Sequence, residues 1–120
     1  MSKHTLVLGA SLNPARYSNL AINRIKSRGH EVKAFGLKAG EVNGVQINTE
    51  LMPYKDIDTV TLYLNPKRQS MYYDYVIGLN PKRVIFNPGT ENPEFYNLLK
   101  QNNINYEVAC TLVMLGTGQY

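Results

Sequence analysis

The sequence lacks the features that mark secreted and membrane proteins. It contains a single cysteine, Cys110, so no disulfide can form within the chain. No apolar run approaches the roughly 20 residues that span a bilayer. The first residues run directly into an apolar, strand-like stretch without a charged leader or a small-residue cleavage site. These absences predict a cytoplasmic protein that does not bind membranes.

The sequence also lacks the motifs of several enzyme classes. Its two histidines, His4 and His30, form no metal-ligand spacing with each other or with Cys110. Neither a nucleophile elbow nor a Walker motif occurs. Both histidines fall at the starts of predicted strands, away from the sheet edge where ligands bind. We therefore expect no metal site, no catalytic residue and no enzymatic activity.

Basic residues are in moderate excess and are dispersed. Thirteen Lys and Arg residues against nine Asp and Glu give a formal charge of +4, and the longest basic cluster is a dipeptide. This dispersal argues against nucleic acid as a partner. An excess of this size fits a protein that holds one small, multiply phosphorylated ligand. A merely basic, solvated surface remains the alternative.

Length and periodicity indicate one α/β domain over residues 1–120. An apolar strand (4–9), an amphipathic helix (18–28) and a second strand (31–35) form a βαβ unit, whose strands should be parallel. Residues 37–56 show no helical pattern, and residues 45–47 form at most a short extended piece. The later elements predicted are strands at 58–64, 83–86 and 104–108, helices opened by Asn65-Pro66 and Asn92-Pro93, and an apolar tail at 110–115. The prediction is a three-layer Rossmann-like domain with an open, mainly parallel five-stranded sheet.

The turn after the first strand has the chemistry of a phosphate site. In GASLNPARYS (9–18), Gly9 allows a tight turn, and the following helix directs its first N–H groups to the same point. Ser11 and Ser18 offer hydroxyl donors, and Arg16 adds a guanidinium. A second loop, which contains Asn87-Pro88, follows another strand at the same predicted edge.

The turn is a poor match to the NAD fingerprint G-x-G-x-x-G. Ser11 replaces its second glycine and Pro14 its third. Residues 35–38 end the second strand with Lys38 and without the carboxylate that would hold a ribose. A cation at this corner favours an additional phosphate. An NAD(P)-binding enzyme or redox sensor of the same fold, with NADP preferred over NAD, remains the alternative reading.

Five segments together carry a family resemblance. They are GASLNPARYS (9–18), GHEV (29–32), DIDTV (56–60), NPGTENPE (87–94) and the cysteine after the last strand. The chain resembles the small stand-alone CoA-binding domain proteins, whose fold is similar to the CoA-binding domain of the succinyl-CoA synthetase alpha subunit and of ADP-forming acyl-CoA ligases. Larger relatives carry their catalytic phosphohistidine in a further domain that this chain lacks, so ligase activity is not expected.

The resemblance implies that coenzyme A or an acyl-CoA binds at the carboxyl edge of the sheet. The residues implied around the phosphates are Gly9, Ala10, Ser11, Asn13, Arg16 and Ser18, with Lys38 nearby. Those implied along the adenine and pantetheine path are Leu64, Asn65, Pro88 and Gly89. Cys110, in an apolar context, is expected to be an inert buried thiol, and a mixed disulfide with CoA is the functional alternative.

The partner expected from the sequence is thus a small nucleotide cofactor. Tyr72, Tyr73 and Tyr75 share one predicted helix, which core or interface packing explains better than stacking on nucleic acid. A homodimer through this helix and an unknown protein partner both remain open.

Overall fold

The fold is built from strands and helices, and four of the strands follow one another directly after the first helix. The computed structural model describes residues 3–120; Met1 and Ser2, which belong to the segment expected to carry no leader, lie outside the described residues. The strands are β1 (Thr5–Ala10), β2 (Val32–Gly36), β3 (Gly40–Val42), β4 (Val45–Asn48), β5 (Thr59–Leu62), β6 (Arg83–Phe86) and β7 (Asn105–Val108). The helical segments are α1 (Tyr17–Ser27), α2 (Pro66–Gln69), η1 (Ser70–Tyr72), α3 (Tyr73–Leu79), α4 (Pro93–Gln101) and α5 (Thr111–Gly116).

Within residues 3–120 the sheet has seven strands in the order β3-β4-β2-β1-β5-β6-β7. Neighbouring strands are parallel except for β3, which runs antiparallel to β4. The predicted Rossmann-like α/β class is confirmed, and each of the five predicted strands has its counterpart in β1, β2, β5, β6 or β7. The predicted number of five strands is wrong, because β3 and β4 add to it.

The two additional strands form a hairpin within residues 37–56, where no helix was expected, and β4 contains the short extended piece expected at 45–47. Asn43 and Gly44 connect them with φ angles of 49° and 81°. Positive φ at both central residues is the requirement of a two-residue type I′ turn, and Asn-Gly is its preferred sequence. β4 then joins the parallel sheet through the pairs Ala34–Ile47 and Phe35–Asn48.

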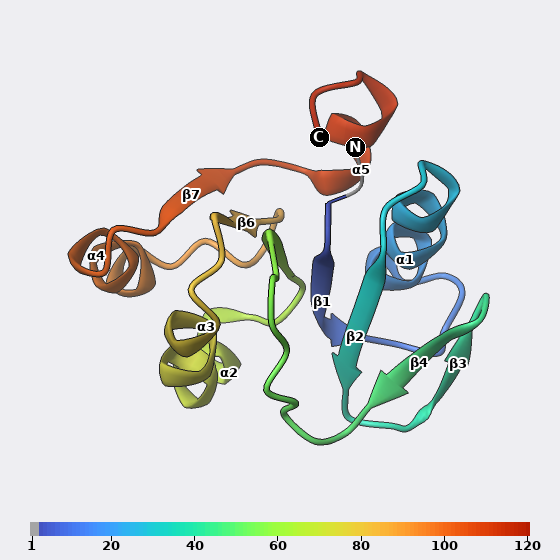
Figure 1. Ribbon diagram of the computed structural model, residues 1–120, viewed down its shortest axis with the longest axis horizontal. Helices are drawn as coiled ribbons and strands as arrows, with labels where there is room; N and C mark the ends of the chain where they lie inside the picture. Colours follow the sequence, from blue (N-terminus) through green and yellow to red (C-terminus); the bar gives the residue numbers. More distant parts are fainter. Residues whose placement is uncertain (1–2) are drawn as a thin grey trace.

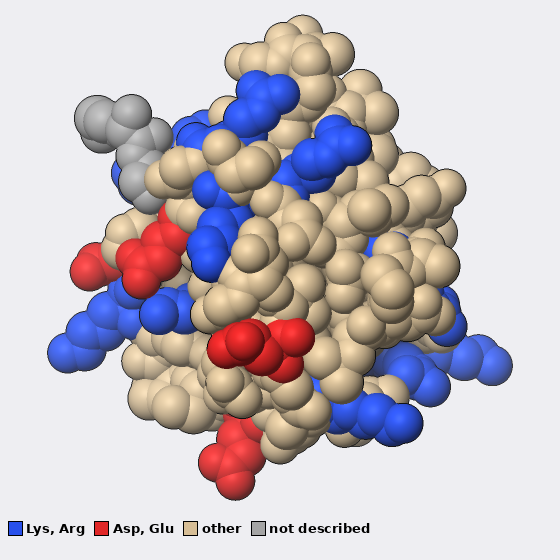
Figure 2. Space-filling view, turned by 90° about the vertical axis from the view of Figure 1, so that its right-hand side faces the viewer, with Lys and Arg blue, Asp and Glu red and all other residues tan. Residues whose placement is uncertain are grey.

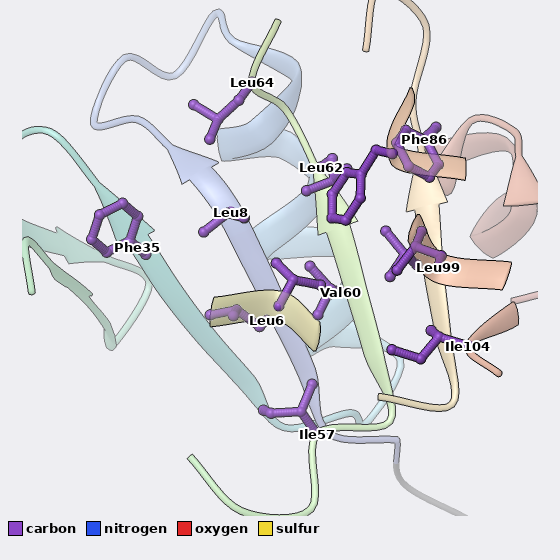
Figure 3. Packing of buried hydrophobic residues seen from close by; sticks show 13 residues of the cluster. Leu6, Leu8, Phe35, Ile57, Val60, Leu62, Leu64, Phe86, Leu99 and Ile104 are labelled. Atoms are coloured by element: carbon purple, nitrogen blue, oxygen red, sulfur yellow. The ribbon is translucent and has the colours of Figure 1, made fainter. Parts of the chain in front are cut away.

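Helices cover both faces of the sheet, so the three predicted layers are present (Figure 1). Leu6 and Leu8 of β1 face a cluster with Val60, Val76 and Phe95, beneath α3 and α4. Figure 3 shows this cluster from close by. Val7, which points to the opposite face, packs in a second cluster with residues of α1 and α5. The alternation along β1 follows from the two-residue period of a strand.

Two helical segments differ from the predictions. The predicted tail at 110–115 forms the helix α5, which packs on the same face of the sheet as α1. The helix opened by Asn65-Pro66 is divided into α2, η1 and α3, and the side chain of Met71 at this break is 72% exposed. The helix starts themselves are confirmed: Asn65 accepts a hydrogen bond from the Arg68 N–H, and Asn92 accepts one from the Phe95 N–H.

A tight contact at the carboxyl end of β2 generates the first testable prediction. A Cβ at Gly36 would overlap the backbone carbonyl oxygen of Ala10 in β1. We expect Gly36→Ala to lower the free energy of unfolding by about 2–3 kcal/mol, since the two strands must move apart. Urea unfolding measures this loss.

Gly78→Ala is the matched control. Gly78 lies inside α3, and an added Cβ would meet no atom within 4 Å. Alanine has the higher helix propensity, so this variant should gain about 0.5–1 kcal/mol. Equal effects of the two substitutions would contradict the proposed contact between β1 and β2.

Candidate functional site

A hollow of about 850 Å³ lies at the carboxyl edge of the sheet. The loops that follow β1, β2, β5 and β6 form its walls. All eleven cofactor-binding residues predicted from the sequence line it, namely Gly9, Ala10, Ser11, Asn13, Arg16, Ser18, Lys38, Leu64, Asn65, Pro88 and Gly89. The structure thus brings the predicted residues together, while their contact with a ligand stays a prediction. The volume falls within the usual range of small-molecule sites.

Gly9 permits the turn that opens the hollow. Its φ angle is +101°, a conformation that residues with a Cβ rarely adopt. A Cβ at this position would also lie 3.0 Å from the carbonyl carbon of Tyr63 and 3.1 Å from the side chain of Leu64. The end of β1 therefore approaches the loop after β5 more closely than any other residue would allow.

Short-range hydrogen bonds order the loop between β1 and α1. The Asn13 N–H donates to the Ser11 hydroxyl oxygen (3.1 Å), and the Ala15 N–H donates to the Asn13 side-chain carbonyl (2.9 Å). The Asn19 amide, on α1, donates to the Ser11 backbone carbonyl (2.9 Å). These bonds fix the loop against its own helix, so the loop is preorganised for a ligand.

The N-terminus of α1 faces the hollow without a side-chain cap. Arg16 occupies the N-cap position with extended backbone, no side chain in the described chain accepts from its first turn, and that turn holds no acidic residue. By contrast, Asn65 and Asn92 cap α2 and α4. Ser18, in the first turn of α1, is buried and lines the hollow. Uncapped N–H groups and the positive end of the helix dipole favour an anion here.

The charges around the hollow have one sign. Arg16, Lys38 and Arg68 line it, and no Asp or Glu among residues 3–120 does so. Arg16 and Lys38 belong to the walls built by the β1 and β2 loops, and Arg68 lies on α2. Arg68 was not among the residues predicted to bind. Its position just after Asn65-Pro66, at a helix start on the carboxyl edge, was the available signal.

The apolar wall of the hollow is an extension of the core. Phe35, Leu64 and Tyr72 line the hollow and also belong to the core cluster or pack against it. The rings of Phe35 and Tyr72 meet edge to face with centroids 5.3 Å apart. Figure 3 places Phe35 near the end of β2 and Leu64 in the loop after β5. The remaining lining residues that sequence reasoning missed are Leu12, Tyr17, Gly36, Leu37, Tyr63 and Thr90.

Tyr63 is the lining residue whose acidity is most changed. Burial raises the pKa of its phenol to about 12. Its hydroxyl makes no hydrogen bond to any described residue, and the neighbouring hydroxyls of Thr61 and Thr111 bond to each other at 2.8 Å. The phenol therefore keeps its proton at neutral pH.

Cys110 lies outside the residues that line the hollow. It is half-buried at the N-cap of α5, so the prediction of a buried thiol is wrong. The local apolar sequence suggested burial, but the residue falls in the connection between β7 and α5, where neighbours cover it only partly. The mixed disulfide with CoA stays a prediction.

The histidines lie at the amino edge of the sheet, as predicted. His4 precedes β1 and pairs with Glu31 at 3.3 Å, and His30 precedes β2 and accepts a hydrogen bond from the Lys3 N–H at 2.9 Å. Burial lowers the pKa of His30. The two side chains therefore stand at the opposite end of the strands from the hollow.

The surface charges do not form one basic area on the face shown in Figure 2. Lys and Arg side chains there occur in separate groups, with Asp and Glu between them. Within residues 3–120, no helix has the length and apolar character needed to cross a bilayer. No group of three or more His, Cys, Asp or Glu side chains in this range is placed to hold a metal ion.

Comparisons with known proteins agree with this architecture. The crystal structure of an uncharacterized protein superimposes with a TM-score of 0.97 at 49% identity, covering 100% of this chain and 99% of that one. A Thermus thermophilus protein, cell-free ID.343, gives 0.86 at 23% identity, covering 99% and 91%. A hypothetical protein from Pyrococcus horikoshii OT3 gives 0.85 at 26% identity, covering 97% and 83%.

The family comparison covers nearly the whole sequence. No curated protein matches the chain. The family model described as a CoA binding domain matches residues 3–116 of the 120. With the Gly9 turn, the parallel sheet and the hollow at its carboxyl edge already in place, the match means that this chain belongs to the CoA binding domain family.

Proposed function

We propose that the hollow binds coenzyme A or an acyl-CoA through its phosphates and that the chain's own residues catalyse no reaction on it. The observation that carries the proposal is the convergence of Arg16, Lys38 and the uncapped N-terminus of α1 on a hollow that no carboxylate of residues 3–120 lines. CoA carries a diphosphate and a ribose 3′-phosphate, so it presents several negative charges to such a surface. Membership of the CoA binding domain family supports this choice of ligand.

The lining residues form a polar part that binds the phosphates and a second part that binds the pantetheine arm. The amides of the Gly9 turn and of the first turn of α1 hold the diphosphate, and Arg16 adds a charge-assisted pair. Lys38, in the loop after β2, holds the ribose 3′-phosphate. The pantetheine arm extends along the loops after β5 and β6, where Leu64 and Gly89 line the hollow.

The absence of catalysis is part of the proposal. Among the described residues, the hollow is lined by no His, Cys, Asp or Glu. Tyr63, with a pKa of about 12, is too weakly acidic to exchange protons efficiently near neutral pH. The remaining polar groups bind and orient a ligand without acid or base chemistry of their own.

An NADP-binding function is the second candidate. The βαβ unit with Gly9 would serve it equally well, and Lys38 without a neighbouring carboxylate favours the 2′-phosphate of NADP over the ribose of NAD. Ser11 and Pro14, in place of two fingerprint glycines, favour CoA.

Calorimetric titration with CoA, NAD and NADP tests the function directly. We expect CoA to bind at least about tenfold more tightly than either dinucleotide. The turn after β1 has Ser11 and Pro14 in place of two glycines of the dinucleotide fingerprint, which disfavours both NAD and NADP. If titration with NADP releases binding heat and titration with CoA up to about 1 mM does not, NADP rather than CoA is the ligand.

Removing the guanidinium of Arg16 should weaken the hold on the diphosphate. We expect Arg16→Gln to lower the affinities for CoA and for dephospho-CoA alike, by about tenfold each, because both ligands carry the diphosphate. Arg24→Gln is the matched control: Arg24 is exposed on the same helix and does not line the hollow. Equal losses in the two variants would show that only the net charge matters.

Removing the ammonium of Lys38 should act on the 3′-phosphate alone. We expect Lys38→Met to reduce CoA affinity about fivefold while dephospho-CoA, which lacks this phosphate, changes by less than about twofold. Lys55→Met makes the same charge change at an exposed position outside the hollow. A loss of dephospho-CoA affinity as large as that of CoA would remove the assigned contact.

A further inference from the structure

Gln69 is a buried carboxamide that connects two walls of the hollow. Its side chain is 1% exposed, at the end of α2. Its Nε2 donates to the backbone carbonyls of Leu64 and Thr90, each at 2.8 Å. Leu64 belongs to the loop after β5 and Thr90 to the loop after β6, and both residues line the hollow. One amide group therefore spans the gap between the two loops.

A second amide fixes the orientation of the first. Asn92 donates from Nδ2 to the Gln69 Oε1 (2.9 Å) and to the Tyr73 hydroxyl oxygen (2.7 Å). Its Oδ1 also caps α4, accepting from the Phe95 N–H at 3.3 Å. Gln69 thus uses both of its N–H donors and its acceptor. A flipped amide would place its oxygen against the two carbonyl oxygens and its nitrogen against the Asn92 amide nitrogen.

The loop after β6 is ordered independently at its base. The Thr90 hydroxyl donates to the Asn87 backbone carbonyl at 2.7 Å, and the Asn87 amide donates to the Leu62 carbonyl at 2.8 Å. Asn87 therefore connects the two loops where they leave the sheet, and Gln69 connects them farther out. An apolar side chain could fill the volume of Gln69 but would leave two buried carbonyls without donors.

We propose that Gln69 is a positioning residue for ligand binding: by fixing the separation of the loops after β5 and β6, its carboxamide shapes the part of the hollow that receives the pantetheine arm of CoA. The assignment of this arm rests on the proposed function. The phosphate-binding turn after β1 and the Lys38 corner make no hydrogen bond to Gln69, so their hold on the nucleotide end is separate.

The test compares two ligands in two variants. Gln69→Met keeps the volume and removes the amide. Thr5→Val removes another hydrogen bond of a buried residue, the one to Tyr120 at the amino end of β1 away from the hollow, and serves as the stability control. At a temperature where both variants are folded, Gln69→Met should bind CoA about tenfold more weakly and adenosine 3′,5′-diphosphate, which lacks pantetheine, less than about threefold more weakly. Thr5→Val should change neither affinity by more than about twofold.

Hydrogen exchange gives a readout that needs no ligand. The amides of Leu64, Asn65, Gly89 and Thr90 should exchange faster in Gln69→Met and at an unchanged rate in Thr5→Val, because only the first variant releases the loops. If Gln69→Met does not fold, Gln69→Asn retains an amide too short to reach both carbonyls and should show the same pattern with smaller changes.

Three outcomes would overturn the proposal. They are equal losses for CoA and for adenosine 3′,5′-diphosphate, an equal loss of CoA affinity in Thr5→Val, and unchanged exchange in both loops. If the wild-type protein binds no CoA, the proposed function fails, and the exchange data alone decide whether Gln69 holds the loops.

Discussion

The close backbone contact at the carboxyl end of β1 is the constraint on which the site depends. Gly9 lies against the backbone of Tyr63, and Gly36 lies against the carbonyl of Ala10, without room for a Cβ at either glycine. Because three strands meet this tightly, the chain can turn over the sheet edge and begin α1 directly above it. The amides of α1 are then presented to the hollow by the fold itself.

The main hydrophobic core supports this edge of the sheet. Phe35, Leu64 and Tyr72 belong to the main core or pack on it, so the hollow's apolar wall cannot move without disturbing that core. Around the wall, Asn87 and Gln69 place polar bonds between loops that would otherwise depend on packing alone. Charge is confined to the rim, where Arg16, Lys38 and Arg68 remain exposed to solvent. The hollow therefore combines a fixed apolar wall with exposed cations at its margin.

Local sequence signals explain what could be predicted. Apolar runs gave the five parallel strands, Gly9 with the following helix gave the position of the hollow, and Asn-Pro pairs gave two helix starts. The β3–β4 hairpin was missed although Asn43-Gly44 carries its turn signal and residues 45–47 were expected to form a short extended piece, because β3 (GEV) has only three residues and no apolar run. Gln69 could not have been found, since its partners at Leu64, Thr90 and Asn92 meet only through tertiary structure.

The β3–β4 hairpin also changes which strand forms one edge of the sheet. A parallel sheet that ended at β2 would leave a long, regular row of free backbone groups, which is a template for uncontrolled strand addition. Here the outermost strand on that side is β3, with only three residues, and a tight turn ends it. Few N–H and C=O groups therefore remain available along this margin, which disfavours fibril-like growth from one molecule to the next.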